Sequence, residues 1–166
     1  MSNTAYFYAG SVLIVDDDRL LGGLTVLAGL VSWRYHFEQL AFPEGGAAEV
    51  EVALVADYAV ASSIVLVASF YALEVNLDKL PPLAYIYTLT AVFFVLVGWF
   101  PPYGLPRFRL KDTEGGQGDD EGAPAGYIFF HSLWHLFSSL AIFQVGEAHL
   151  AHVLSEEHAA ALIFLQ

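Results

Sequence analysis

The chain has 166 residues, of which 57% are hydrophobic and 14% are charged, and its formal net charge is −12. This composition is too apolar for an ordinary soluble domain of that length and is typical of a membrane protein. The acidic, lysine-poor balance makes the chain a poor candidate for binding nucleic acid or anionic lipid headgroups, because both need clustered Lys and Arg. The chain has no cysteine, so any metal site must use histidine and carboxylate ligands.

Apolar stretches divide the chain into predicted helices. The first, from Thr4 to Val15, precedes three aspartates and is predicted to be a short helix or the tail of a lost span. Four later stretches approach the roughly 20 apolar residues that a helix needs to cross a bilayer. They cover Leu20 to Leu40, Val52 to Leu73, Leu83 to Phe100 and Gly126 to Gly146. The sequence therefore predicts an all-α, multi-pass integral membrane protein with about four spans.

The connections between these segments differ in length and character. AFPEGGAAEVE and NLDKLPP are short and turn-rich, so the first three spans are expected to pack as antiparallel neighbours. Residues 111–125 are acidic and glycine-rich, and they are predicted to be a flexible loop within a bundle domain of residues 1–146. Residues 147–166 mix charged and apolar positions, which is typical of an amphipathic helix at a membrane surface.

Five polar residues are predicted to lie at one end of this bundle. They are Ser32 and His36 in the first span, Asp57 in the second, and His131 and His135 in the last. The members of each Ser/His or His/His pair are four residues apart, so each pair shares one helix face. Because successive spans alternate in direction, all five residues are expected within roughly 14 Å of the same surface.

Three histidines beside a carboxylate are typical of a catalytic zinc site. Three neutral imidazoles leave a fourth position open, and zinc held in this way lowers the pKa of bound water to about 7 and polarises a carbonyl. Asp57 is then expected to orient or deprotonate that water, or to hold an imidazole by a hydrogen bond. Ser32 is expected to donate a hydrogen bond to a developing oxyanion.

Each of these residues also has a purely structural interpretation. A histidine in a transmembrane helix can hydrogen-bond to a neighbouring helix. Asp57 can pair with Arg34, which is expected close to the same end of the bundle. The Ser32 hydroxyl can bond back to its own helix. The occurrence of all five polar residues at one depth is what favours a metal site.

The order of these motifs resembles that of a known superfamily. SWRYHFEQ carries Ser32 and His36, VADYAVASS carries Asp57, and HSLWHLF carries His131 and His135. This Ser-xxx-His, Asp, His-xxx-His order resembles the seven-helix CREST superfamily, which includes alkaline ceramidases, progestin/adiponectin receptors and post-GPI-attachment proteins. The amino-acid sequences of the motifs are most similar to those of its myomaker-like branch. The similarity covers about residues 25–145, and the chain is apparently shortened, with about four spans where the superfamily has seven.

The resemblance implies an intramembrane zinc ion and hydrolysis of a lipid amide or ester bond. The implied zinc ligands are His36, His131 and His135. Asp57 and Ser32 are implied beside the zinc as catalytic residues. The expected fold is then a reduced form of the seven-helix bundle, with a membrane lipid as substrate or ligand.

The sequence is consistent with three functions. The first is a zinc-dependent lipid amide or ester hydrolase. The second is a non-enzymatic membrane module for lipid sensing, receptor-like signalling or fusion, in which a metal holds the helices together. The third is a transmembrane b-type haem protein with His36 and one of the later histidines as axial ligands. A homo-oligomer that completes the walls of so small a bundle is also open.

Overall fold

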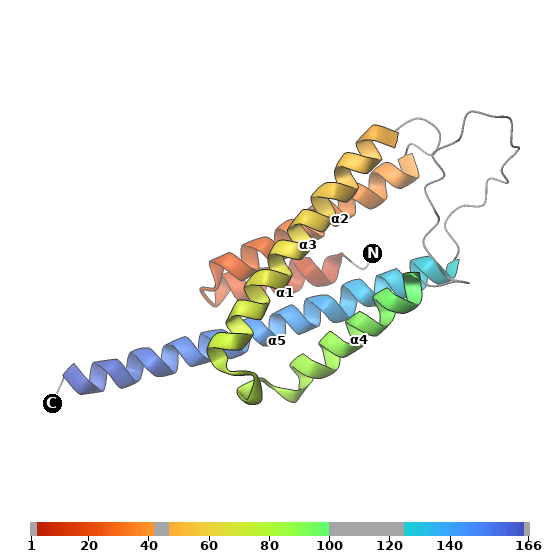
Figure 1. Cartoon of the computed structure of the whole chain (residues 1–166). Coiled ribbons are helices and arrows are strands. Elements are labelled where there is room, and N and C mark those ends of the chain that lie inside the picture. Colours follow the sequence, from red (N-terminus) through yellow and green to blue (C-terminus); the bar gives the residue numbers. More distant parts are fainter. Residues whose placement is uncertain (1–2, 42–46, 100–124, 165–166) are drawn as a thin grey trace, which may run out of the picture.

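The computed structural model describes residues 3–41, 47–99 and 125–164, and every regular element in these ranges is helical (Figure 1). The elements are α1 (Thr4–Val15), α2 (Arg19–Ala41), α3 (Ala47–Val75), the short 3₁₀ helix η1 (Leu77–Lys79), α4 (Pro82–Trp99) and α5 (Ala125–Phe164). The all-α prediction is therefore confirmed. The predicted loop at residues 111–125 lies outside the described residues, except for its last residue.

Three aspartates turn the chain between α1 and α2. Asp17 has a positive φ of 74°, a left-handed conformation that aspartate tolerates better than most residues. Asp18 then caps α2, because its Oδ1 atom accepts a hydrogen bond from the backbone N–H of Leu21 at 3.0 Å. The acidic run after the first apolar segment thus reverses the chain and starts the next helix.

Helix α5 organises the bundle. It contacts α1, α2, α3 and α4, while α2 also packs against both α1 and α3. Within the described part of the chain, α4 packs along α5 and not along α3, and Figure 1 shows it running beside α5. The prediction that the first three spans are neighbours is therefore right for α2 and α3 and wrong for α3 and α4. Leu80 is extended before two prolines, which cannot continue the preceding helix, so the chain leaves α3 and crosses to α5.

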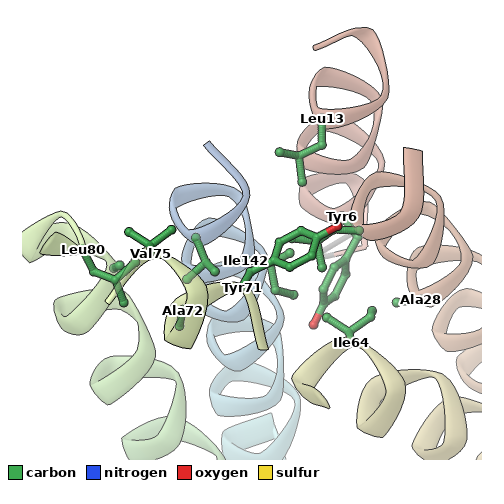
Figure 2. Close-up of a cluster of buried hydrophobic side chains, with 12 residues drawn as sticks. Tyr6, Leu13, Ala28, Ile64, Tyr71, Ala72, Val75, Leu80 and Ile142 are labelled. Carbon is green, nitrogen blue, oxygen red and sulfur yellow. The ribbon is translucent and has the colours of Figure 1, made fainter. Parts of the chain in front are cut away.

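The buried core lies where α1, α2, α3 and α5 meet, and Leu80 and Ala84 extend it to the start of α4 (Figure 2). Its members are mostly aliphatic side chains with two tyrosines, namely Tyr6, Leu13, Leu21, Ala28, Ile64, Tyr71, Ala72, Val75, Leu80, Ala84, Ile142 and Val145. Figure 2 shows the two tyrosines in the same cluster, Tyr6 on the ribbon of α1 and Tyr71 on that of α3. This cluster holds the short helix α1 against the long helices.

The outside of the bundle is also rich in large apolar side chains. Leu66 on α3 is 71% exposed and Leu89 on α4 is 69% exposed, and many others on these helices are similarly uncovered. In the described residues, one helix, Ala48–Val75, is long and apolar enough to cross a membrane. Its 28 residues extend about 42 Å, which exceeds a hydrocarbon core of about 30 Å.

The predicted set of four spans is not confirmed by length and composition. Helix α2 carries Arg34 and Glu38 near its end and three glycines. Within the residues described with their side chains, the apolar stretch of α4 is Pro82–Val97. Helix α5 interrupts its apolar residues with histidine, serine and glutamine. These polar residues lower the hydropathy of α2 and α5, which are otherwise long enough to cross a membrane.

Helix α5 continues through Gly146, where the last span was predicted to end. A Cβ atom at Gly146 would lie 2.6 Å from Leu13 Cδ2, so the glycine allows α1 to pack closely on α5 instead of ending the helix. The predicted helix end is therefore wrong. Figure 1 shows the C-terminal part of α5 extending beyond the other helices, and its placement at a membrane surface stays a prediction.

Glu147 lies where α5 passes the turn between α1 and α2. Its Oε1 atom is buried and accepts no hydrogen bond within the described part of the chain. Burial first, and then the neighbouring Asp16 carboxylate, raise the pKa of Glu147 above its ordinary value of 4.5. The folded chain therefore favours the protonated form of Glu147 more than the unfolded chain does. The contribution of protonated Glu147 to folding stability is complete below the ordinary pKa of glutamate. It is lost as the pH rises through the raised pKa of the folded protein.

Glu147→Gln is expected to raise the melting temperature at neutral pH, because glutamine resembles the protonated acid. The difference from the parent should vanish at about pH 4, where the parent is protonated as well. Thermal unfolding followed by circular dichroism measures this. Glu157→Gln, on the exposed end of the same helix, is the control and should change little at either pH. A lower melting temperature for Glu147→Gln at neutral pH would contradict this account of the Glu147 environment.

Candidate metal centre

Three helix segments carry the five residues predicted for the site. Ser32 and His36 lie in the second half of α2, Asp57 lies in the first half of α3, and His131 and His135 lie near the start of α5. The packing of α2 and α3 against α5 brings these segments to one end of the bundle. The structure brings four of the five into direct contact, and Asp57 is the exception.

The three histidines bring their Nε2 atoms together. His131 Nε2 lies 3.1 Å from His36 Nε2 and 2.9 Å from His135 Nε2. One ligand atom from each histidine lies within 4.8 Å of the other two. The ring planes cross at 82° for His36 and His131, 80° for His36 and His135, and 85° for His131 and His135. Near-perpendicular rings let three nitrogens approach one point without steric conflict between the ring atoms.

Hydrogen bonds among the three rings cannot give every Nε2 atom a well-aligned partner. An imidazole nitrogen has one in-plane site, which is either a proton or a lone pair. His131 Nε2 faces two nitrogens, so it can align that site well with only one of them. Tetrahedral zinc with Zn–N bonds of about 2.0–2.1 Å sets two nitrogens about 3.3 Å apart and accepts a lone pair from each. The observed separations of 2.9 and 3.1 Å are close to that value, so the residues fit the ion.

Ser32 is directed towards the histidines. Its side chain is 1% exposed, and its Oγ atom lies 3.4 Å from His135 Nε2, which is a long hydrogen bond. Thr25, on the same helix, bonds back to the carbonyl of Leu21 at 2.6 Å. Ser32 makes no such bond in the described part of the chain. The interpretation of Ser32 as a hydroxyl bonded back to its own helix is therefore not supported.

Asp57 is buried near the site but does not touch the histidines. It is 7% exposed, and within the described residues it makes no hydrogen bond to a histidine and no ion pair. The pairing with Arg34 is not observed, because Arg34 Nε lies 3.6 Å from Glu38 Oε1 on its own helix.

Sequence reasoning missed two aromatic residues at this site. The Tyr6 ring of α1 and the His135 ring form a T-shaped contact, with centroids 5.5 Å apart and planes at 82°. The Trp134 ring lies 5.1 Å from the His131 ring and 4.8 Å from the His135 ring. Trp134 lies inside the motif HSLWHLF, so its position between the two histidines could have indicated a place at the site. No sequence feature indicated Tyr6, because nothing in the sequence relates α1 to residues more than 120 positions away.

Two other histidines of α5 lie away from the cluster. His149 Nε2 lies 2.9 Å from Glu74 Oε2, and the His149 ring stacks on that of Tyr71 with centroids 3.5 Å apart. His152 Nε2 lies 3.5 Å from Glu156 Oε1 on the same helix. These contacts account for both residues as structural side chains and make them useful controls.

Comparison of the chain with protein-family models, curated proteins and solved structures gave no match. The fold and the site define a helical protein with three converging histidines, one of them buried and two partly buried. The resemblance to the CREST superfamily stays a prediction.

Proposed function

We propose that this protein is a multi-pass membrane protein that holds zinc with His36, His131 and His135 and hydrolyses an amide or ester bond of a membrane lipid. The observation that carries the proposal is the convergence of three Nε2 atoms from two helices. His36 and His131 are 95 residues apart in the chain, yet their nitrogens are 3.1 Å apart. We propose hydrolysis of a lipid amide or ester bond because the motifs resemble those of the CREST superfamily.

The surface of the bundle supports a membrane location. Helix α3 is long enough to span, and its exposed face carries apolar side chains such as Val65 and Leu66. Large exposed apolar patches are uncommon on soluble monomers and are typical of proteins that face lipid or a partner. The 18 residues of α4 extend about 27 Å, close to the thickness of the hydrocarbon core. In this proposal α2, α4 and α5 cross the membrane beside α3.

The side chains around the histidines can perform the proton transfers of hydrolysis. When bound, zinc supplies a lowered pKa for water and polarises a carbonyl. The reaction joins the water oxygen to the carbonyl carbon, breaks the C–N or C–O bond, and moves a proton to the leaving amine or alcohol. Asp57 takes that proton from water and passes it to the leaving group. Ser32 donates its hydroxyl hydrogen to the carbonyl oxygen as negative charge develops there.

The environment of Asp57 supports this role. Burying a carboxylate without a partner destabilises a fold, so such residues are rare unless function requires them. Asp57 is 7% exposed and makes no ion pair among the described residues. A carboxylate that only held a metal ligand in place would be expected to hydrogen-bond to an imidazole, and Asp57 does not do so in the described chain.

The geometry argues against haem. Two axial histidines face each other across the plane of the porphyrin. The Nε2 atoms of His36 and His131 are 3.1 Å apart, and His135 approaches the same point. This arrangement leaves no space for a macrocycle between the rings. A metal that only holds the helices together is the alternative that the following experiment distinguishes.

Asp57→Asn is expected to lower hydrolysis by about 10²–10⁴-fold while the zinc content stays at about one ion per chain. The amide keeps the shape of the side chain but cannot take up a proton. Detergent-purified protein is assayed in mixed micelles with two fluorescent probes, an N-acyl sphingosine and a diacyl phosphatidylcholine. Zinc is measured by elemental analysis on the same samples.

Asp78→Asn is the matched control, because Asp78 is an exposed carboxylate in η1. It should keep full activity and full zinc content. If Asp57→Asn loses zinc and helical structure together, the metal serves to hold the fold and the hydrolase proposal is wrong. Unchanged turnover in Asp57→Asn would also contradict the assigned role.

A further inference from the structure

The second ring nitrogen of His135 has no hydrogen-bond partner among the described residues. This atom, Nδ1, is buried as well. A histidine that ligates a metal usually donates its other N–H to a carboxylate or carbonyl, and that bond fixes the orientation of the ring. At His135 another group must fix the ring, because its Nε2 atom contributes to the cluster.

The Tyr6 ring contacts His135 directly. Tyr6 is 6% exposed, and its ring meets that of His135 at 82° with centroids 5.5 Å apart. Edge-to-face packing is a preferred arrangement for aromatic rings, and it restricts rotation of the smaller ring. Tyr6 comes from α1, so this contact reaches the metal ligands from a helix that carries none of them.

The Tyr6 hydroxyl adds a second connection to the same turn of α5. It lies 2.6 Å from Ser138 Oγ. The Ser138 hydroxyl donates its single proton to backbone carbonyls, at 2.7 Å to Trp134 and 3.2 Å to His135. Tyr6 must therefore be the donor in its bond to Ser138. The phenol thus ties α1 to the backbone turn that begins at His135.

We propose that Tyr6 is a positioning residue of the metal centre, which holds His135 in its ligating orientation through the edge-to-face ring contact and the hydrogen bond to Ser138. This inference rests on the proposed zinc site. Tyr6 thus restrains the His135 ring, whose Nδ1 atom has no hydrogen-bond partner in the described chain. Helix α1 therefore serves the site although no candidate ligand lies on it.

Tyr71→Phe provides a matched comparison for Tyr6→Phe. Both tyrosines are buried, both belong to the same core cluster, and both hydroxyls connect two segments of the bundle. The Tyr71 hydroxyl donates to Asp18 Oδ1 at 3.2 Å, and its ring stacks on His149. Removing either hydroxyl deletes one long-range hydrogen bond, but only Tyr6 contacts a metal ligand.

Tyr6→Phe and Ser138→Ala are each expected to weaken zinc binding by about 10-fold or more, the usual effect of losing a group that supports a ligand. The double variant should be no weaker than the stronger single one, because both changes remove the same bond. Zinc affinity is measured by competition with a chromophoric chelator. The visible spectrum of the Co²⁺-loaded protein should shift in these variants, since it reports the ligand geometry. Tyr71→Phe should keep the parental affinity and spectrum.

Three results would overturn the inference. The first is a Tyr6→Phe protein with the parental zinc affinity and Co²⁺ spectrum, and this result would leave the proposed function intact. The second is an equal loss in Tyr71→Phe, which would make the effect one of general stability. The third is a parent that binds no zinc, which would remove the proposed function as well.

Discussion

Replacing His131 and His135 together with alanine is expected to reduce bound zinc from about one ion per chain to none. Two of the three candidate ligands are lost, and one imidazole cannot hold the ion against water and buffer. Elemental analysis of the purified proteins measures the change. Helical content, followed by circular dichroism, shows whether the bundle is still folded.

His149→Ala with His152→Ala is the control for this change. It removes two imidazoles from the same helix, but these bind Glu74 and Glu156 away from the cluster. The control protein should keep its zinc. If both double variants lose the same amount of zinc, or if the His131/His135 variant keeps it, the metal is bound somewhere other than at the converging histidines.

Gly22→Ala and Gly23→Ala are expected to change stability in opposite directions, although the residues are adjacent on α2. A Cβ atom at Gly22 would lie 2.8 Å from the backbone oxygen of Gly10 and 2.9 Å from the backbone nitrogen of Ile14. Backbone atoms cannot move aside as a flexible side chain can, so α1 must separate from α2. Overpacking of this kind costs about 1–3 kcal/mol.

A Cβ atom at Gly23 would meet nothing within 4 Å. Alanine there is expected to stabilise the helix by up to about 1 kcal/mol, because alanine has the higher helix propensity. Chemical unfolding in detergent measures both free energies. Because Tyr6 lies on α1, Gly22→Ala should also weaken zinc binding, whereas Gly23→Ala should not. Equal effects of the two substitutions would show that α1 and α2 do not approach as closely as described.

The sequence predicted the helices well because their signals are local. Apolar runs bounded by proline, glycine and aspartate mark α1 to α4 within a few residues. The two errors came from residues whose roles depend on other helices. Gly146 looked like a helix end, but it makes space for Leu13 of α1. The NLDKLPP connection looked like a tight turn between neighbours, but its prolines send α4 to α5 instead.

The candidate site was predictable in part for the same reason. Spacings of four residues place Ser32 with His36 and His131 with His135, and the alternating directions of α2 and α5 bring the two pairs together. The contribution of α1 was not predictable, because a tyrosine in TAYFYAG carries no periodic relation to a distant motif. The position of Asp57 outside hydrogen-bonding distance of the histidines depends on how α3 packs, which no local pattern encodes.

X-ray absorption at the zinc edge tests the central claim most directly. Protein purified in detergent is loaded with one equivalent of zinc and freed of excess metal. We expect three imidazole nitrogens at about 2.0–2.1 Å from the zinc, and two in a His36→Ala variant. A zinc ion surrounded by oxygen ligands alone, or one that a weak chelator removes completely, would contradict the assignment of His36, His131 and His135 as metal ligands.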